Sequence, residues 1–346
     1  MKRLPAVNAL ILCCASGALF SYLRVPLPWM IGPLLAMACG KFAGASLDSP
    51  RAGRASGQIV IGCALGLYFT PVVVGEVGAH WYLLIAAAML AVLLAYASGW
   101  FLIRSAGLDA TTALFASVPG GAAEMTILGE RFGAQLDRVV LAQSLRVLIV
   151  VVMVPFAFTL LGVHGSDAYH PAQLDVDAVR LIVLLAAAAA AGALLATCGI
   201  PNAWMLGPLA VSTALTANEV HLSAMPTILS NAAQVLLGCA LGSRFERESL
   251  RSAPRFIAMV CLSVVLAIVL SALFGWIIAL VGAVPVSTMV LAVAPGGMAE
   301  MCITAKVLQL GVPLITAAHV TRVIIVVTTT GPTFRLAKRV GRRLRP

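Results

Sequence analysis

The strongest constraint on the fold of this 346-residue chain is an internal duplication. Four motifs occur twice, in the same order: Trp29–Leu34 and Trp204–Leu209, Gln58–Gly66 and Gln234–Gly242, Pro119–Met125 and Pro295–Met301, Arg146–Val151 and Arg322–Val327. The second copy follows after 175 residues for the first motif and after 176 residues for the other three. Four matches in the same order and at nearly constant separation indicate that the chain consists of two copies of one module.

Each copy contains six apolar segments. They are 5–23, 28–47, 57–74, 80–103, 109–131 and 138–162 in the first copy, and 178–198, 203–221, 230–245, 256–282, 287–306 and 313–334 in the second. Apolar residues make up 61% of the sequence and charged residues 10%, against about 45–50% and about 25% in soluble domains. The runs are continuous, and a spanning helix needs about 20 apolar residues. The sequence therefore predicts an all-α polytopic membrane protein with almost no room for a catalytic or DNA-binding domain.

The fifth segment of each copy is expected to be interrupted. Pro119–Gly121 and Pro295–Gly297 lie at the centres of these segments, and a proline followed by two glycines breaks a helix. The arms 109–118 and 122–131 are each about 15 Å long as helices, which is half of a hydrocarbon layer of about 30 Å. Two geometries fit these lengths: a helix broken at mid-membrane, and a re-entrant helical hairpin whose Pro-Gly-Gly tip reaches the midplane.

The basic residues favour the re-entrant hairpin. With a hairpin in each copy and the N-terminus inside, 17 of the 23 Lys and Arg residues face the cytoplasm, as the positive-inside rule requires. Each copy then has five transmembrane helices, and this odd number makes the two copies an inverted repeat. We expect a bacterial inner (plasma) membrane protein with both termini cytoplasmic. Its expected regions are a first membrane repeat (1–165), an external loop (166–177), a second membrane repeat (178–334) and a basic cytoplasmic tail (335–346).

Inverted repeats whose interrupted helices meet at the midplane are typical of secondary transporters. The free N–H groups and the positive dipole end at the start of each second arm suit an anion or a polar solute. The candidate substrate-binding residues are the hairpin tips, the acid after each tip and a polar pair on each sixth segment: Pro119, Gly120, Gly121, Glu124, Gln143, Arg146, Pro295, Gly296, Gly297, Glu300, His319 and Arg322.

The arginines Arg146 and Arg322 are expected near the midplane, with Gln143 and His319 one turn below them on the same face. Charges at that depth need partners, and the two glutamates are the obvious acids. Two interpretations are open. In the first, each glutamate permanently neutralises an arginine and braces the hairpin against the helix. In the second, an anionic substrate or a proton competes for this pairing.

The eight cysteines and five histidines show no metal-ligand spacing, so neither a metal nor another cofactor is expected. The short basic tail is expected at the membrane surface rather than on DNA. The expected partners are therefore the lipid bilayer and a small-molecule substrate, with no direct contact to nucleic acid, and assembly into a homo-oligomer is open. The expected function is a transporter of a small polar or anionic solute, not an enzyme.

The duplicated PGGxxEM and WMxGPL motifs, together with the chain length, resemble the AbrB family of bacterial membrane proteins, also called AbrB duplication proteins. The resemblance covers the whole chain. Family members are labelled ammonia monooxygenases or AbrB-family transcriptional regulators, which implies a role in regulating gene expression and carries over no site residue. A membrane sensor that acts indirectly on gene expression is thus the alternative function. An ammonia monooxygenase is the least favoured, because it would need a copper or iron site.

Overall fold

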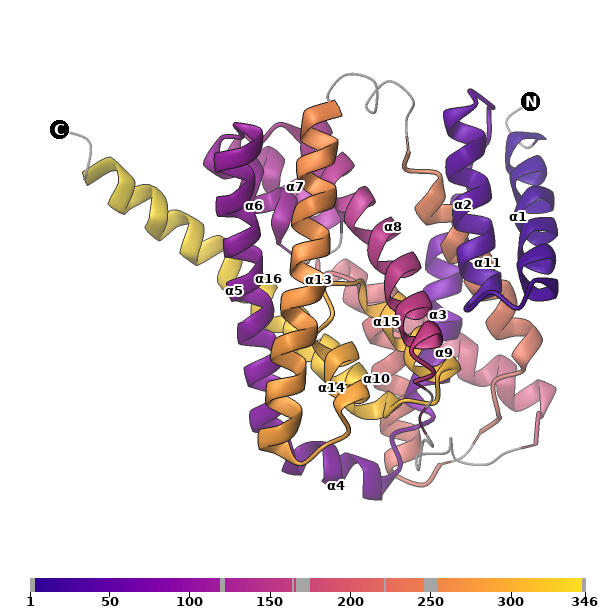
Figure 1. Ribbon diagram of the computed structural model, residues 1–346. Helices are drawn as coiled ribbons and strands as arrows, with labels where there is room; N and C mark the ends of the chain where they lie inside the picture. The colour runs from indigo at the N-terminus through magenta and orange to yellow at the C-terminus, as the bar shows by residue number, and fades with distance from the viewer. Residues whose placement is uncertain are drawn as a thin grey trace.

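The computed structural model describes residues 4–118, 122–163, 165, 175–220, 222–245 and 254–343. Within these ranges the chain forms fifteen α-helices and no β-strand, as Figure 1 shows. The predicted all-α fold class is therefore confirmed. The helices pack into one bundle, and the C-terminal end of α16 projects away from it (Figure 1).

In the part of the chain that the structure describes, six helices have the length and the apolar composition needed to cross a membrane. They are α1 (Leu4–Tyr22), α5 (Trp81–Ala106), α8 (Leu136–Leu160), α9 (Ala178–Thr197), α13 (Pro254–Gly282) and the part of α16 (Val312–Arg343) up to Thr329. Large apolar side chains such as Ile11, Leu93, Val183 and Trp276 are exposed on these helices. A soluble monomer rarely exposes so much apolar surface, whereas lipid solvates it. These helices are therefore compatible with a multi-pass membrane protein.

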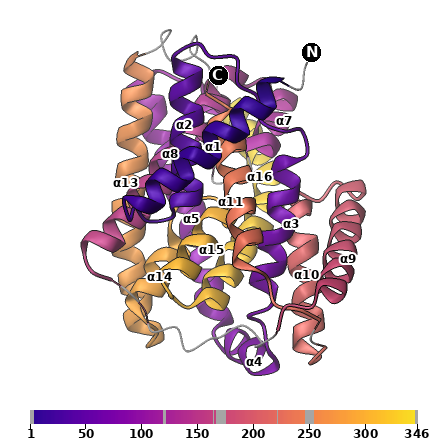
Figure 2. The same cartoon turned by 90° about the vertical axis from the view of Figure 1, so that its right-hand side faces the viewer.

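Four shorter helices form the middle of the bundle. They are α2 (Pro28–Phe42), α3 (Gly53–Gly66), α10 (Ala203–Ala217) and α11 (Thr227–Gly242). Their 14–16 residues give lengths of about 21–24 Å, less than a hydrocarbon layer of about 30 Å. The sequence predicted full spans here, so these helices are shorter than expected. Figure 2 shows α11 between α2 and α3, and α10 packs against α3.

The duplicated motifs make these central contacts. A Cβ atom added at Gly62 would lie 2.7 Å from the carbonyl oxygen of Met205, and one added at Gly238 would lie 2.5 Å from that of Met30. Only glycine therefore permits these approaches, which resemble the small-residue crossings of membrane helices. In both cases the helix with the GCALG motif of one half (α3 or α11) crosses the helix with the WMxGPL motif of the other half (α10 or α2). The same contact therefore occurs twice, with the roles of the two halves exchanged.

Gly242→Ala is expected to destabilise the protein by about 1–3 kcal/mol, because overpacking forces neighbouring atoms to move. The added Cβ would lie 2.5 Å from the carbonyl oxygen of Leu34 and 2.6 Å from the Cβ of Met37. Thermal unfolding of the purified protein in detergent measures the effect. Gly75→Ala is the matched control, because nothing lies within 4 Å of its added Cβ. A Gly242→Ala melting temperature equal to that of the wild type would contradict the crossing.

The predicted segment 57–74 is two helices rather than one. Helix α3 ends at Gly66, and α4 (Pro71–Ala79) begins at an angle of 89° to it. The cause is local: Thr70 precedes a proline and takes an extended conformation, which is what a following proline favours. The Thr70 hydroxyl then accepts a hydrogen bond from the amide of Val73 and caps the new helix.

Two pairs of short helices fold back on themselves. They are α6 (Ala110–Ser117) with α7 (Ala122–Phe132), and α14 (Val286–Val293) with α15 (Met298–Val307). The amide of Gln135, after α7, donates to the Thr112 hydroxyl at 2.9 Å, and its side chain reaches Asp109. In the second pair, a Cβ added at Gly311 would lie 2.6 Å from Thr288. Each pair therefore ends beside the place where it begins, and is a helical hairpin.

One pair of equivalent helices from the two halves, α5 and α13, runs in opposite directions. Helices α5 and α13 lie side by side (Figure 1). A Cβ added to Gly282, at the end of α13, would lie 2.6 Å from Leu83, near the start of α5. At the other end, Leu102 of α5 and Val260 of α13 line one cavity. The end of each helix therefore lies against the start of the other.

Candidate functional site

In the first half, α8 holds the end of the first hairpin helix. The Nη1 atom of Arg146 donates to the carbonyl oxygen of Val118 at 2.9 Å and to that of Ser117 at 3.4 Å. One turn earlier, the Nε2 atom of Gln143 donates to the carbonyl oxygens of Phe115 at 2.7 Å and Val118 at 3.0 Å. These oxygens belong to the last turn of α6, which carries a partial negative charge and has no helical donors left.

The second half repeats this arrangement on α16. Arg322 donates from Nη1 to the carbonyl oxygen of Ala294 at 2.8 Å and from Nη2 to that of Gly296 at 2.6 Å. The Nε2 atom of His319 lies 3.2 Å from the carbonyl oxygen of Leu291. A carbonyl oxygen only accepts, so Nε2 carries the ring hydrogen. Each hairpin is thus attached to its following helix by an arginine and a second polar side chain one turn away.

The sequence suggested the glutamates as partners of these arginines, and the structure gives Glu300 a different environment. Glu300 lies in the first turn of α15, after the N-cap residue Gly297. Its carboxylate folds back so closely that a side chain at position 297 would collide with it. Among the described residues, no cation lies within ion-pair distance of Glu300. Its charge therefore faces the positive end of α15. The side chain of Glu124 lies outside the described residues, as do Pro119–Gly121.

A polar cavity of about 60 Å³ lies at the tip of the second hairpin. We call it the hairpin cavity. Its polar lining comes from both halves of the chain: Arg54, Gln58, Arg146, Asn202, Arg244, Glu300 and Arg322, with the backbone of Gly296 and Gly297. Within the described part of this lining, four arginines face one glutamate, and this excess of positive charge suits an anion.

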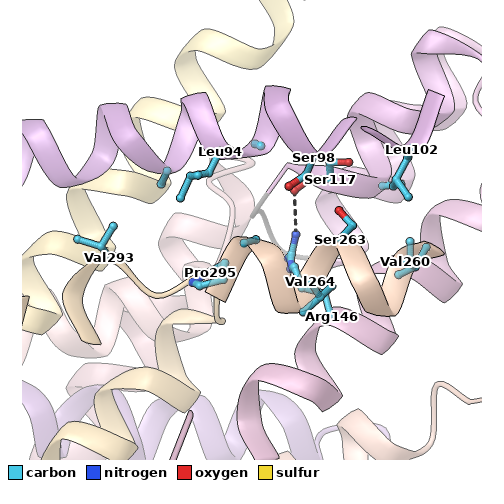
Figure 3. Close-up of a pocket in the computed structure, with 15 residues that line it drawn as sticks. Leu94, Ser98, Leu102, Ser117, Arg146, Val260, Ser263, Val264, Val293 and Pro295 are labelled. Atoms are coloured by element: carbon cyan, nitrogen blue, oxygen red, sulfur yellow. Dashed lines mark hydrogen bonds between the residues drawn. The ribbon is translucent and has the colours of Figure 1, made fainter. Parts of the chain in front are cut away.

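A smaller cavity of about 30 Å³ lies on the other side of Arg146, and Figure 3 shows its lining. Three serines from α5, α13 and the end of α6 give it hydroxyl groups. Arg146 lines both cavities, while Pro295 lines the smaller one and Gly296 the hairpin cavity. Arg146 and the turn at Pro295 therefore separate the two spaces.

A wider opening of about 580 Å³ adjoins the hairpin cavity. We call it the vestibule. It shares Arg54, Gln58 and Asn202 with the hairpin cavity, and it adds Arg51 and Arg131. Apolar side chains of α7, α10 and α16 complete its wall. The vestibule is thus a basic, partly apolar space beside the hairpin cavity.

The equivalent residues of the other half are buried. Ile127, in the vestibule wall, is 54% exposed, whereas its repeat equivalent Ile303 is 2% exposed. Val327 of the vestibule is half-buried, and its equivalent Val151 is fully buried. The two hairpins therefore have the same attachments but unequal access from outside the bundle.

Comparison with known proteins places the chain in a family. The family model described as “Transition state regulatory protein AbrB” matches residues 7–338. The chain belongs to the AbrB family. It is 24% identical over 334 residues to “Putative regulator AbrB” of Escherichia coli (strain K12), covering 95% of this chain and 96% of that protein. It is 28% identical over 346 residues to “Uncharacterized protein YhjN” of Bacillus subtilis (strain 168), covering 93% and 90%. The resemblance seen in the motifs is confirmed.

In this AbrB-family chain, several sequence-predicted residues meet in one place. The hairpin cavity contains Arg146, Gly296, Gly297, Glu300 and Arg322. Pro295 lies at the smaller cavity. Gln143 and His319 are fully buried behind the arginines, where they bond to hairpin carbonyl oxygens and line neither cavity.

Four further polar residues of this AbrB-family chain were not selected from the sequence: Arg54, Gln58, Asn202 and Arg244. The sequence placed the two arginines among loop charges that set topology. The sequence does contain one indication that Arg54 and Gln58 act together. Arg54 and Gln58 are four residues apart on α3, so they share one face of that helix.

Proposed function

We propose that this chain is a secondary transporter of a small anionic solute, which binds in the hairpin cavity. The observation that carries the proposal is the meeting of four arginines from both halves around one cavity at a hairpin tip. Polar cavities at interrupted helices are the substrate sites of secondary transporters. The N-terminus of α15 adds its free amides and positive dipole end to this site.

The proposal includes an inverted repeat with two re-entrant hairpins. The opposite directions of α5 and α13 support the inversion. The contacts of Gln135 with Thr112 and Asp109 support re-entry, because a crossing segment would separate these residues by about 30 Å. Five spans and one hairpin in each half then give both halves the same topology in opposite orientations.

Unequal access to the two hairpins supports alternating access. In the proposed cycle, the halves exchange conformations, so the vestibule closes and the equivalent region around Ile303 and Val151 opens. The arginines of the vestibule, Arg51, Arg54 and Arg131, support a cytoplasmic opening by the positive-inside rule. Both termini are then cytoplasmic, in a bacterial inner membrane.

A membrane sensor that regulates gene expression indirectly is the second candidate, and the names of the family and of the Escherichia coli relative favour it. Helix α16 continues to Arg343, beyond its membrane window that ends at Thr329, and offers a basic helix to a partner protein. For a sensor, deletion of 335–346 abolishes regulation and leaves ligand binding intact. Neither candidate includes a chemical reaction, and no three His, Cys, Asp or Glu side chains group as metal ligands within the described ranges.

Uptake into proteoliposomes tests the transporter. The purified protein is reconstituted and offered radiolabelled carboxylates and phosphates, with and without a proton gradient. We expect uptake or counterflow of at least one anion, loss of this flux in Arg54→Gln, and retention in Arg104→Gln, whose side chain lies over Trp100 away from both cavities. Flux at the level of empty liposomes for the whole panel would refute the proposal.

Cysteine accessibility tests the alternation. In a background without the eight native cysteines, Ile127→Cys is expected to react readily with a membrane-impermeant thiol reagent, and its equivalent Ile303→Cys to resist it. A transported anion should slow the first reaction and speed the second, since the cycle exchanges the exposed side. Equal reactivity at both positions, or no response to a transported anion, would contradict alternating access.

A further inference from the structure

The vestibule and the hairpin cavity are the outer and inner parts of one region and differ in size, and Arg54, Gln58 and Asn202 belong to both linings. The inner part, at about 60 Å³, has room for about four water molecules. The outer part, at about 580 Å³, falls in the range of about 300–1,000 Å³ that is usual for small-molecule sites. A ligand that fills both parts has a small head and a larger body.

The inner part suits an anionic head. Arg322 is 3% exposed, and its Nη atoms are engaged with the hairpin carbonyl oxygens. Its Nε hydrogen has no partner among the described residues. Among the lining residues that the structure describes, Glu300 is the one acid, against four arginines. A carboxylate is small enough for this space and pairs with guanidinium groups in a planar geometry.

The outer part suits an apolar body. Its wall carries Ile127, Leu128, Ile200, Trp204 and Val327, and none of the lining residues that the structure describes is acidic. Ile127 remains more than half exposed, so part of this wall is available to a ligand. Burying such a surface against an apolar group is favourable in proportion to the area covered.

We propose that the ligand is an organic carboxylate with an apolar chain or ring, whose carboxylate enters the hairpin cavity while its apolar part covers the vestibule wall. This inference rests on the proposed function in taking the hairpin cavity as the anion site. An inorganic anion would occupy the inner part and leave the wall uncovered.

Binding of a homologous series tests the inference. The full chain in phosphatidylcholine nanodiscs is titrated calorimetrically with acetate, butyrate and hexanoate, and empty nanodiscs are titrated to subtract partitioning. Affinity is expected to rise about two- to fourfold for each added methylene group, since a fully buried one is worth about fourfold. Hexanamide, which lacks the charge, and sulfate, which lacks the chain, are expected to bind far more weakly than hexanoate.

Two variants with matched controls separate the two parts of the site. Ile127→Ser is expected to flatten the dependence on chain length, whereas Ile228→Ser, at an 84% exposed residue that lines neither space, retains it. Arg54→Gln is expected to weaken all carboxylates alike, and Arg104→Gln to bind as the wild type does. Equal affinities along the series, equal binding of hexanoate and hexanamide, or an unchanged chain-length dependence in Ile127→Ser would overturn the proposed ligand class.

The outcome for the ligand class is distinguishable from that for transport. Binding that depends on chain length, without uptake of any carboxylate, supports the ligand class and refutes the transporter. Uptake of sulfate or phosphate without a chain-length effect supports the transporter and refutes the ligand class. Loss of carboxylate binding on adding phosphatidylglycerol to the nanodiscs would assign the vestibule to lipid, and would also overturn the inference.

Discussion

Arg322→Ala is expected to lose most of its folded yield and to unfold well below the wild-type temperature. The substitution removes two short hydrogen bonds, at 2.8 Å to the carbonyl oxygen of Ala294 and at 2.6 Å to that of Gly296. Each oxygen left buried without a donor costs about 1–3 kcal/mol. A total of about 2–6 kcal/mol is a large part of a typical folding free energy of about 5–15 kcal/mol. Size-exclusion yield and thermal unfolding in detergent measure the loss.

Three variants make this prediction specific. Arg322→Lys keeps the charge but lacks the planar fork, so it should recover only part of the stability. His319→Gln introduces the residue that the first half has at Gln143, and should stay close to wild type. Arg104→Ala removes an exposed arginine near Trp100 and should have little effect. If Arg322→Ala unfolds at the same temperature as Arg104→Ala, the attachment of the second hairpin does not contribute to stability.

Glu300→Gln is expected to tighten anion binding by about 30-fold. Glu300 is the one acid among the described lining residues of the hairpin cavity, so a bound anion is repelled by its charge. For two charges about 7 Å apart at an effective dielectric constant of about 20, the repulsion is about 2 kcal/mol. The amide has nearly the same size and remains beside Gly297, so the fold is expected to persist. Titration of both proteins with hexanoate in nanodiscs measures the change.

Glu76→Gln is the matched control for this effect. Glu76 is an exposed residue of α4 that lines neither the hairpin cavity nor the vestibule, so its removal should leave hexanoate affinity unchanged. Weaker binding in Glu300→Gln would show that the carboxylate helps to hold the ligand. Equal tightening in both variants would attribute the change to overall charge rather than to the cavity.

The sequence predicted the features that are encoded locally. The repeat is visible as identical residues in one register, and helices end at Ser117 and Val293, just before the Pro-Gly-Gly motifs that the sequence marked as breaks. The separation of α3 from α4 was also encoded locally, by Thr70 before Pro71. It was missed because hydropathy reports how apolar a segment is and not which direction it takes.

The partners of the arginines were not predictable in this way. The charges of Glu124 and Glu300 can be read from the sequence. Carbonyl oxygens occur in every residue, so the sequence does not indicate which of them accept hydrogen bonds from the arginines. The arginines therefore suggested ion pairs, but Arg322 donates to the end of a hairpin helix. The position of Arg54 and Arg244 in the hairpin cavity could not be predicted either, because it depends on how the two halves pack.

The reciprocal glycine crossings have a consequence for the origin of the chain. Gly62 lies against Met205, and Gly238 lies against Met30, so each half carries both a surface and its complement. Self-complementary surfaces of this kind are those of isologous dimers. A single-copy ancestor would already have possessed everything needed to pair with a second subunit, provided that subunits entered the bilayer both ways. Gene fusion fixes that pairing within one polypeptide and frees each half to diverge, as His319 has diverged from Gln143.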